Sequence, residues 1–232
     1  MVKKQSKFLV QQKMVVGGFT VLLIIIIGYL TWMTVQDAPL GEFVEGEHYQ
    51  LIDNPRRIRS DKIEVMEFFS YACVHCFNLD PNLTDWVEEQ GDNVEFIRIP
   101  AVASEYWRLL GRAYYTLEQI DAIGAHHMTL FRAIHQSRQT FPTPESLFDY
   151  AQDAGIDREL FESTYKSTPV NSALNRADQM SRRLKVASVP TIVIQGKYIV
   201  RTTRAVGPTR MLEVMDYLVE KERTATNTDS EK

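Results

Sequence analysis

The sequence predicts an α/β fold in which a block of helices interrupts a small sheet domain, with a membrane-spanning helix preceding both. Short apolar runs typical of buried strands occur before residue 100 and again after residue 190. Between them, residues 104–184 carry apolar side chains at the three- and four-residue spacing of helices. Near the N-terminus, no charged residue occurs from Met14 to Gln36. Each of these observations predicts one part of the fold.

The N-terminal segment has the pattern of a signal anchor. Residues 14–33, as a helix rising about 1.5 Å per residue, would span roughly 30 Å, the thickness of a bilayer core. Four lysines precede this segment, which predicts a cytoplasmic N-terminus and an exported body. A cleaved signal peptide is the alternative, although its apolar region is normally shorter and no small-x-small cleavage site follows Leu30. We therefore predict a basic cytoplasmic N-terminus (1–13), a transmembrane anchor (14–33) and a linker (34–46). The protein would cross the inner (cytoplasmic) membrane once, with its folded catalytic part on the periplasmic or other extracytoplasmic side.

Composition and charge exclude one class of partner. The chain has 232 residues, enough to bury a core, and its 24% of charged residues is ordinary for a globular protein. The formal net charge is −4, and four of the basic residues precede the anchor, so the remainder is more acidic still. Nucleic-acid binding relies on clustered basic charge, so we expect no nucleic-acid partner.

The first half of the exported part predicts a parallel pair of strands. His48 to Ile52 is a candidate edge strand, and Ile63 to Phe69 is apolar enough to be buried on both faces. Cys73 to Gln90 then predicts a helix, and Val94 to Ile99 predicts a second buried strand. The order strand–helix–strand predicts a right-handed parallel crossover.

The second half predicts a block of helices followed by a hairpin and a last helix. Residues 191–194 and 198–201 predict paired strands, because Gln195-Gly196-Lys197 between them is a turn signal. An amphipathic helix at 208–222 follows, and the polar residues 223–232 predict a flexible tail.

Taken in order, these elements predict a thioredoxin-like fold with an inserted helical domain. The thioredoxin-like domain would comprise residues 47–99 and 186–222, and the inserted helical domain residues 100–185.

The only two cysteines of the chain form the motif Cys73-Val74-His75-Cys76, where the predicted strand ends and the predicted helix begins. A C-x-x-C motif at a helix start is typical of a thiol–disulfide redox site. The unpaired N–H groups and the positive dipole end of a helix stabilise a thiolate on the first cysteine. We therefore predict that Cys73 is the nucleophile, that the shielded Cys76 resolves a mixed disulfide, and that His75 helps to stabilise the thiolate.

Two other interpretations of the cysteine pair remain open. One is a zinc site, but such a site normally needs four cysteine or histidine ligands, and the chain has no second C-x-x-C. The other is an inert buried pair, which an exported, oxidising location disfavours. His126, His127 and His135 are interpreted as surface or packing side chains. We expect neither a metal nor a cofactor.

Charged residues interrupt the apolar runs Val65–Phe69 and Phe96–Ile99 of the two predicted strands. Glu67 stands within the first buried strand and Arg98 within the second. A buried carboxylate is costly unless it is paired. We therefore predict that the two lie together beneath the active-site helix and that Glu67 exchanges protons with Cys76. The alternative is that both side chains reach the surface at strand edges.

Val189-Pro190 stands immediately before the strand at 191–194. Proline is tolerated at a strand start because no N–H is needed there. The backbone of Val189 and Pro190 is a candidate site for pairing with an extended substrate segment. From the dipeptide alone a trans bond is expected, because only about 5–6% of X–Pro bonds in folded proteins are cis.

The segment Glu67 to Cys76, with the sequence EFFSYACVHC, resembles the active-site segment of the bacterial periplasmic thiol oxidases of the DsbA family. The later segment 186–191, VASVPT, is similar to a second family motif, and the order of elements agrees from 47 to 222. The resemblance implies a thioredoxin fold with an inserted helical domain. It also implies that Pro190 follows a cis peptide bond.

The resemblance assigns roles to the site residues as well. It makes Cys73 the attacking cysteine, Cys76 the resolving cysteine and His75 the tuning residue. Glu67 corresponds to the family's buried glutamate, and Asp80 and Arg98 fall on charged positions near it. The family has proline where this chain has Val74, so the reduction potential could differ.

The function implied by the resemblance is the introduction of disulfide bonds into reduced or unfolded exported proteins. It also implies reoxidation by a DsbB-like, quinone-linked membrane oxidase. One alternative is a membrane-tethered thiol reductase or isomerase, which His75 and the lack of an evident dimerisation domain disfavour. The other is a peptide-binding chaperone that uses the groove beside Pro190 without redox turnover.

Overall fold

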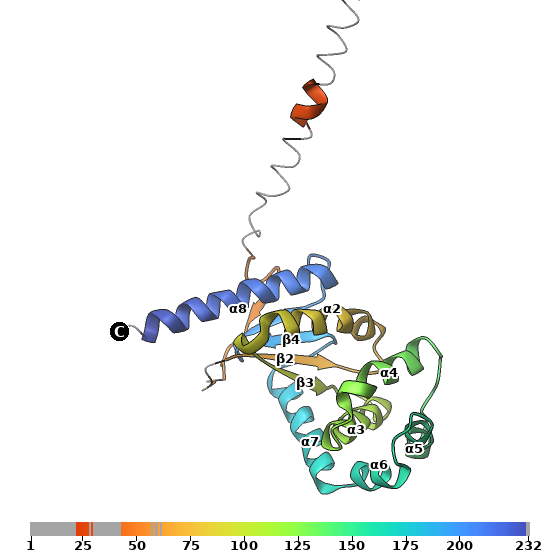
Figure 1. Cartoon of the computed structure of the whole chain (residues 1–232). Helices are drawn as coiled ribbons and strands as arrows, with labels where there is room; N and C mark the ends of the chain where they lie inside the picture. The colour runs from red at the N-terminus through yellow and green to blue at the C-terminus, as the bar shows by residue number, and fades with distance from the viewer. Residues whose placement is uncertain are drawn as a thin grey trace, which may run out of the picture. The chain divides into compact units, whose positions relative to one another are not determined.

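A five-stranded sheet organises the part of the chain that the structure describes (Figure 1). The computed structural model describes residues 22–27, 29, 43–56, 58, 60 and 62–230, without the side chains of 226–230. The strands follow the order β1-β5-β4-β2-β3 across the sheet. Their bounds are β1 Gln50–Leu51, β2 Ile63–Phe69, β3 Val94–Pro100, β4 Thr191–Ile194 and β5 Tyr198–Arg201.

Strand β2 lies at the centre of the fold and connects directly to the cysteine motif. All seven of its residues are buried, as the continuous apolar run predicts. It pairs in parallel with β3 and antiparallel with β4. A parallel pair needs a long crossover, and α2 (Val74–Gln90) supplies it. The register sets Glu67 directly beside Arg98, so the charges that interrupt the two strands are neighbours.

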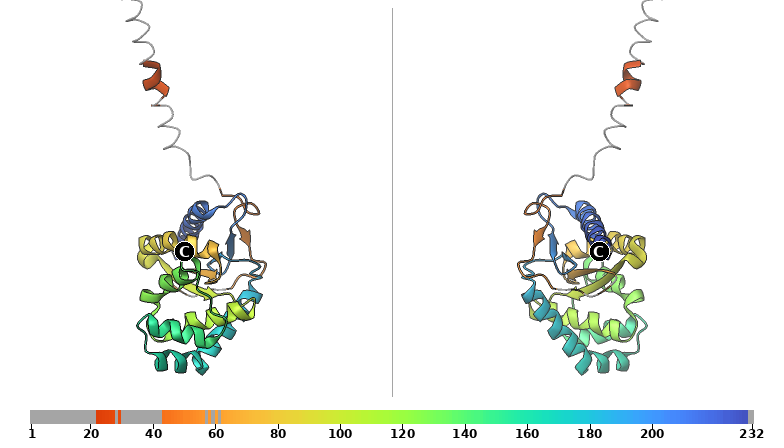
Figure 2. Two further views of the ribbon diagram at one scale, coloured as in Figure 1. Left: turned by 90° about the vertical axis from the view of Figure 1, so that its right-hand side faces the viewer. Right: turned by 90° about the vertical axis from the view of Figure 1, so that its left-hand side faces the viewer.

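Helices cover both faces of the sheet. On one face, α2 and α8 (Pro208–Ser230) lie side by side, and their apolar side chains share a core with the strands (Figures 1 and 2). Leu83 of α2, Met215 of α8 and Ile192 of β4 are all fully buried in this core. Burying each such side chain contributes about 1.5–3 kcal/mol. On the other face, α7 (Thr168–Arg183) packs on the sheet beside α3 (Glu105–Gln119).

Five consecutive helices between β3 and β4 form the inserted domain. Besides α3 and α7 these are α4 (Ile123–His135), α5 (Pro144–Asp153) and α6 (Arg158–Tyr165). Four of the five begin at a side chain that accepts a backbone N–H of the first turn, namely Ser104, Thr143, Asp157 and Ser167. The domain's core is continuous with Phe69 and Tyr71 at the end of β2. The predicted thioredoxin-like fold with an inserted helical domain is thus confirmed.

The β4–β5 hairpin turns where the sequence predicted. Gln195 and Gly196 both have a positive φ, 53° and 57°. A Cβ on Gly196 would meet the backbone oxygen of Arg56 at 3.2 Å, so both the conformation and the close approach favour glycine.

Two sequence-based boundaries are wrong. The edge strand predicted at 48–52 is reduced to Gln50–Leu51, which pairs with β5. The tail predicted at 223–232 is helical as far as Ser230. Within that helix, Arg223 pairs with Glu220 at 3.2 Å and the Thr224 hydroxyl donates to the Glu220 carbonyl at 2.9 Å. The segment has no glycine or proline to end the helix sooner.

The predicted N-terminal elements fall mostly outside the described residues. The cytoplasmic segment 1–13 lies wholly outside them, as do most of the anchor (14–33) and of the linker (34–46). Of the anchor, residues 22–27 and 29 are described and are helical, with exposed apolar side chains. Among the residues that the structure describes, no helix has the length and apolar character needed to cross a bilayer.

Candidate active site

Cys73 lies at the N-cap of α2, immediately after the segment that leaves β2. Its backbone is extended, with φ −95° and ψ 112°, and its Sγ accepts the backbone N–H of Cys76 at 3.3 Å. Both cysteines are free thiols. Cys76 is fully buried one turn into the helix, whereas Cys73 is partly exposed. The two sulfurs thus differ in access as the sequence predicts.

The same geometry separates the acidities of the two thiols. The pKa of Cys73 falls to about 6, first because it is hydrogen-bonded to the Cys76 side chain. Burial opposes this shift, and the backbone N–H groups of Cys76 and His75 and the charge of His75 reinforce it. Burial raises the pKa of Cys76, and the hydrogen bond with Cys73 and the charge of Glu67 raise it further. Near neutral pH the dithiol therefore carries a single thiolate, on Cys73.

The loop before β4, which contains Val189 and Pro190, lies against Cys73. The Val189–Pro190 peptide bond is cis, as the family resemblance implied and as the dipeptide alone did not. The carbonyl oxygen of Val189 lies 3.5 Å from Sγ of Cys73. Thr191, the first residue of β4, pairs with Phe68 of β2. Sheet pairing thus holds the loop against the cysteine, although more than a hundred residues separate them in the sequence.

Glu67, Arg98 and Asp80 come together beneath α2, so the alternative of surface positions for the two strand charges is wrong. Glu67 is 1% exposed, and its Oε2 lies 3.2 Å from Nε of Arg98 without the alignment of a hydrogen bond. Nη2 of Arg98 donates to Oδ1 of Asp80 at 3.0 Å and to Thr84 at 3.1 Å. Burial raises the pKa of Glu67 to about 7; Arg98 opposes the rise, and the charges of Asp80 and Cys73 add to it.

The buried network extends to two residues to which the sequence assigned no place in it. Nε2 of His127, on α4, lies 3.0 Å from Oδ1 of Asp80, and Nδ1 lies 2.8 Å from the hydroxyl of Tyr71. His127 is therefore a packing residue with a charged partner. A signal was present, because His127 occupies the apolar stripe of α4 with Leu130 and Phe131, where a polar side chain needs a partner. The sequence did not indicate which partner that would be.

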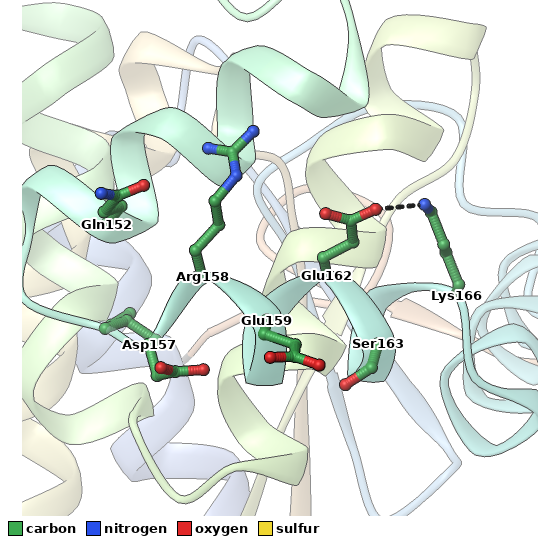
Figure 3. Close-up of a pocket in the computed structure, with 8 residues that line it drawn as sticks. Gln152, Asp157, Arg158, Glu159, Glu162, Ser163 and Lys166 are labelled. Atoms are coloured by element: carbon green, nitrogen blue, oxygen red, sulfur yellow. Dashed lines mark hydrogen bonds and ion pairs between the residues drawn. The ribbon is translucent and has the colours of Figure 1, made fainter.

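Two further features of the described residues were candidates for a second site, a metal centre and a surface hollow. Among the described residues, no group of three or more histidine, cysteine, aspartate or glutamate side chains could hold a metal ion. One hollow is lined by α6 and neighbouring residues (Figure 3). Most of its charged groups have local partners: Arg158 pairs with Asp149, Lys166 pairs with Glu162, and Asp157 caps its own helix. Redox chemistry at the cysteines is what the site can perform.

Comparison with known proteins agrees with this chemistry. Residues 97–219 match the family model of the DSBA-like thioredoxin domain. The thiol:disulfide interchange protein DsbA of Pseudomonas aeruginosa is 34% identical over 189 residues, which cover 81% of this chain and 90% of that protein. The chain belongs to the DsbA family. Because the alignment with this relative covers 81% of the chain, it must include Cys73 and Cys76. The match to the family model begins after both cysteines, at residue 97.

Further DsbA relatives show the same breadth of similarity. DsbA of Azotobacter vinelandii is 35% identical over 71% of this chain and 77% of that protein. The crystal structure of Pseudomonas aeruginosa DsbA matches with a TM-score of 0.76, covering 80% of this chain and 97% of that one at 34% identity. The oxidoreductase DsbA of Xylella fastidiosa matches with a TM-score of 0.72 at 30% identity, covering 78% and 98%. The chain is accordingly a thiol:disulfide oxidoreductase.

Proposed function

We propose that this DsbA-family protein introduces disulfide bonds into reduced or unfolded exported proteins. The observation that carries the proposal is the asymmetry of the two thiols: a stabilised thiolate on the accessible Cys73 and a buried, protonated Cys76. Whatever stabilises the Cys73 thiolate stabilises the reduced form of the pair. When the reduced form of a cysteine pair is stabilised, its disulfide form is a strong oxidant.

The reaction follows from the access to each sulfur. A client thiolate attacks Sγ of Cys73 in the oxidised protein, and the Cys73–Cys76 bond breaks as Cys76 leaves and takes up a proton. A second client thiolate attacks the client sulfur of this mixed disulfide, and Cys73 leaves as the stable thiolate. The client loses two electrons and two protons. The protein gains both electrons and keeps one proton on Cys76, and the other proton goes to solvent.

Glu67 has the properties of a proton carrier for Cys76. Its two carboxyl oxygens are buried, and neither accepts a hydrogen bond from any residue that the structure describes. Its pKa of about 7 lies near neutrality, and its charge acts on Cys76. A group with such a pKa gives and takes protons readily near neutral pH. Glu67 would protonate Cys76 as it leaves and accept the proton again during reoxidation.

The Val189–Pro190 loop is the proposed binding edge for the client. The carbonyl of Val189 already lies 3.5 Å from the sulfur that a client must attack. An extended client segment that pairs with the Val189 backbone would bring its cysteine to Cys73.

We infer from the sequence that residues 14–33 anchor the protein in the inner membrane, with residues 1–13 in the cytoplasm and the redox domain in the periplasm. The support is the uncharged apolar segment and the lysines in front of it. Such an anchor would hold the site near a DsbB-like, quinone-linked oxidase, the partner proposed for reoxidation. Alkaline extraction should leave the full-length chain in the membrane pellet. A soluble product that lacks the N-terminal segment would instead indicate a cleaved signal peptide.

The direction of the reaction is tested by equilibrating the protein with mixtures of reduced and oxidised glutathione. We expect the Cys73–Cys76 disulfide to be reduced even when oxidised glutathione is abundant, which is the behaviour of an oxidant. A strongly reducing equilibrium would favour the reductase or isomerase reading. Cys73→Ser should abolish client oxidation; full activity in that variant would favour the chaperone reading.

A further inference from the structure

His127 lies at the centre of the interface between the two domains. Its side chain is buried, with the residue 7% exposed, and the rings of Phe69, Tyr114 and Phe131 stand edge-on around it. Its pKa is lowered by burial, with Arg98 adding to the effect and Asp80 opposing it. The imidazole is therefore neutral near neutral pH, with one N–H donor and one acceptor nitrogen.

The partners of His127 fix which nitrogen carries the proton. Asp80 is a carboxylate, whose pKa is lowered despite burial by His127 and Arg98, and it can only accept a hydrogen bond. Nε2 of His127 must therefore donate to Oδ1 of Asp80. Nδ1 then accepts the hydroxyl proton of Tyr71, which burial keeps on the oxygen by raising the tyrosine pKa. Every polar atom of the imidazole is satisfied in one tautomer.

Asp80 and Glu67 share one cation. The guanidinium of Arg98 donates a well-formed hydrogen bond to Asp80 but makes only an unaligned ion pair with Glu67. The same oxygen of Asp80 that accepts from Arg98 also accepts from His127. The hydrogen bond from His127 withdraws negative charge from this oxygen of Asp80. Asp80 therefore attracts Arg98 less strongly, and Arg98 interacts more strongly with Glu67.

We propose that His127 is a positioning residue for the redox site: by donating to Asp80 it limits that carboxylate's hold on Arg98 and leaves the guanidinium available to Glu67 beside the cysteines. His127 touches neither sulfur and acts through Asp80 and Arg98. The effect of His127 on the reaction rests on the proposed role of Glu67 as a proton carrier. The effect of His127 on the Glu67 pKa does not depend on that role.

Among the described residues, the titratable and charged groups that act on Glu67 come from three parts of the fold. These groups are Arg98 from β3, Asp80 and Cys76 from α2 together with its N-cap Cys73, and the hydroxyl of Tyr114 from α3. Of these, only Asp80 bonds directly to a histidine. His127 hydrogen-bonds to Asp80 and also packs edge-on against the Tyr114 ring, so the hydrogen-bonded route to Glu67 runs through Asp80, and the Asp80→Asn background separates it from packing.

The test is an NMR titration of the Glu67 carboxyl carbon in the reduced, full-length protein, in His127→Phe and His127→Gln. Phenylalanine keeps the ring volume without a donor, whereas glutamine can still donate to Asp80. We expect His127→Phe to raise the Glu67 midpoint by about one pH unit, the scale of one lost hydrogen bond to a charged group. His127→Gln should reverse most of that shift. The pH profile for oxidation of the reduced protein by glutathione disulfide should move alkaline in parallel.

Asp80→Asn provides a second test with the opposite sign. Removing the Asp80 charge frees Arg98 for Glu67 and removes a repulsion, so the Glu67 midpoint should fall. In the Asp80→Asn background, His127→Phe should have no further effect on Glu67, because the histidine acts through Asp80.

The chain offers a matched control in His135. It lies on the same helix, stacks on Phe77 and donates to the backbone carbonyl of Tyr71 at 2.8 Å, and no carboxylate in the described part of the chain pairs with it. His135→Phe should leave the Glu67 midpoint unchanged. The proposal is overturned if His127→Phe leaves that midpoint in place or lowers it, if His135→Phe shifts it equally, or if the effect of His127→Phe persists in Asp80→Asn. The titration reads Glu67 directly, so a reducing glutathione equilibrium would refute the oxidase proposal without touching this one.

Discussion

Replacing Glu67 by glutamine should stabilise the reduced protein, increasingly so as the pH rises. The carboxyl has a pKa of about 7 in the folded protein against an ordinary value of 4.5. Between those values the folded chain holds a proton that the unfolded chain has released, so the stability of the wild type falls as the pH rises from 4.5 through 7. The separation of the two values corresponds to about 3 kcal/mol, and Glu67 is buried enough that solvent screening does not reduce it. Glutamine has no charge to bury and escapes this loss.

The assay is urea unfolding of the reduced wild type and Glu67→Gln between pH 4 and 8. The free energy of unfolding of the variant should exceed that of the wild type by about 3 kcal/mol more at pH 8 than at pH 4. Glu64→Gln is the matched control, since Glu64 is buried on the same strand but has Arg56 as a donor to both of its oxygens. We expect no gain in stability from that variant at alkaline pH. A difference between Glu67→Gln and wild type that stays constant with pH would refute the reasoning, because the buried charge would then carry no cost.

Three further predictions follow from the same geometry. The thiolate absorbance of the reduced protein should titrate with a midpoint near pH 6, and Cys73→Ser should show no thiolate absorbance at that pH. His75→Ala should raise the midpoint of the Cys73 titration by less than about one pH unit, because His75 is one of several causes of the lowered Cys73 pKa. Cys76→Ser, offered clients that already contain a disulfide, should accumulate mixed disulfides on non-reducing gels: the Cys73 thiolate attacks the client disulfide, and no Cys76 sulfur remains to release the client by forming the Cys73–Cys76 bond. Leu83→Ala, in the fully buried core beneath α2, should lower the free energy of unfolding by about 2–5 kcal/mol in urea titrations without moving the thiolate midpoint.

Much of the candidate site was accessible from the sequence because its signals are local. A C-x-x-C motif after a buried strand is typical of a thiol–disulfide redox site, and its first cysteine does form the N-cap of α2. Glu67 and Arg98 were noticed because each interrupts an apolar strand, and the parallel register brings them together. Asp80 was identified only through the family resemblance, since an aspartate on a helix carries no signal of burial.

The features that the sequence left open have two causes, namely contacts between segments far apart in the chain and weak local signals. His127 was interpreted as packing, and its bond to Asp80 depends on how α4 meets α2, a contact between segments far apart in the chain. The cis bond before Pro190 could not be read from the dipeptide, because local preference favours trans. The helix that continues to Ser230 was missed since polar residues do not distinguish a tail from a solvated helix.

The order of elements, the identity of the two reactive sulfurs and the presence of charges within apolar strand segments can all be derived from the amino-acid sequence. These features depend on periodicity, on helix-start chemistry and on the cost of transferring charge out of water. Each can be recognised from residues that are neighbours in the sequence. Only the tertiary structure decided which charges meet: Arg98 shared between Glu67 and Asp80, and His127 donating to Asp80 from another domain. Pairwise electrostatics depends on distance in space, and separation along the chain does not specify that distance.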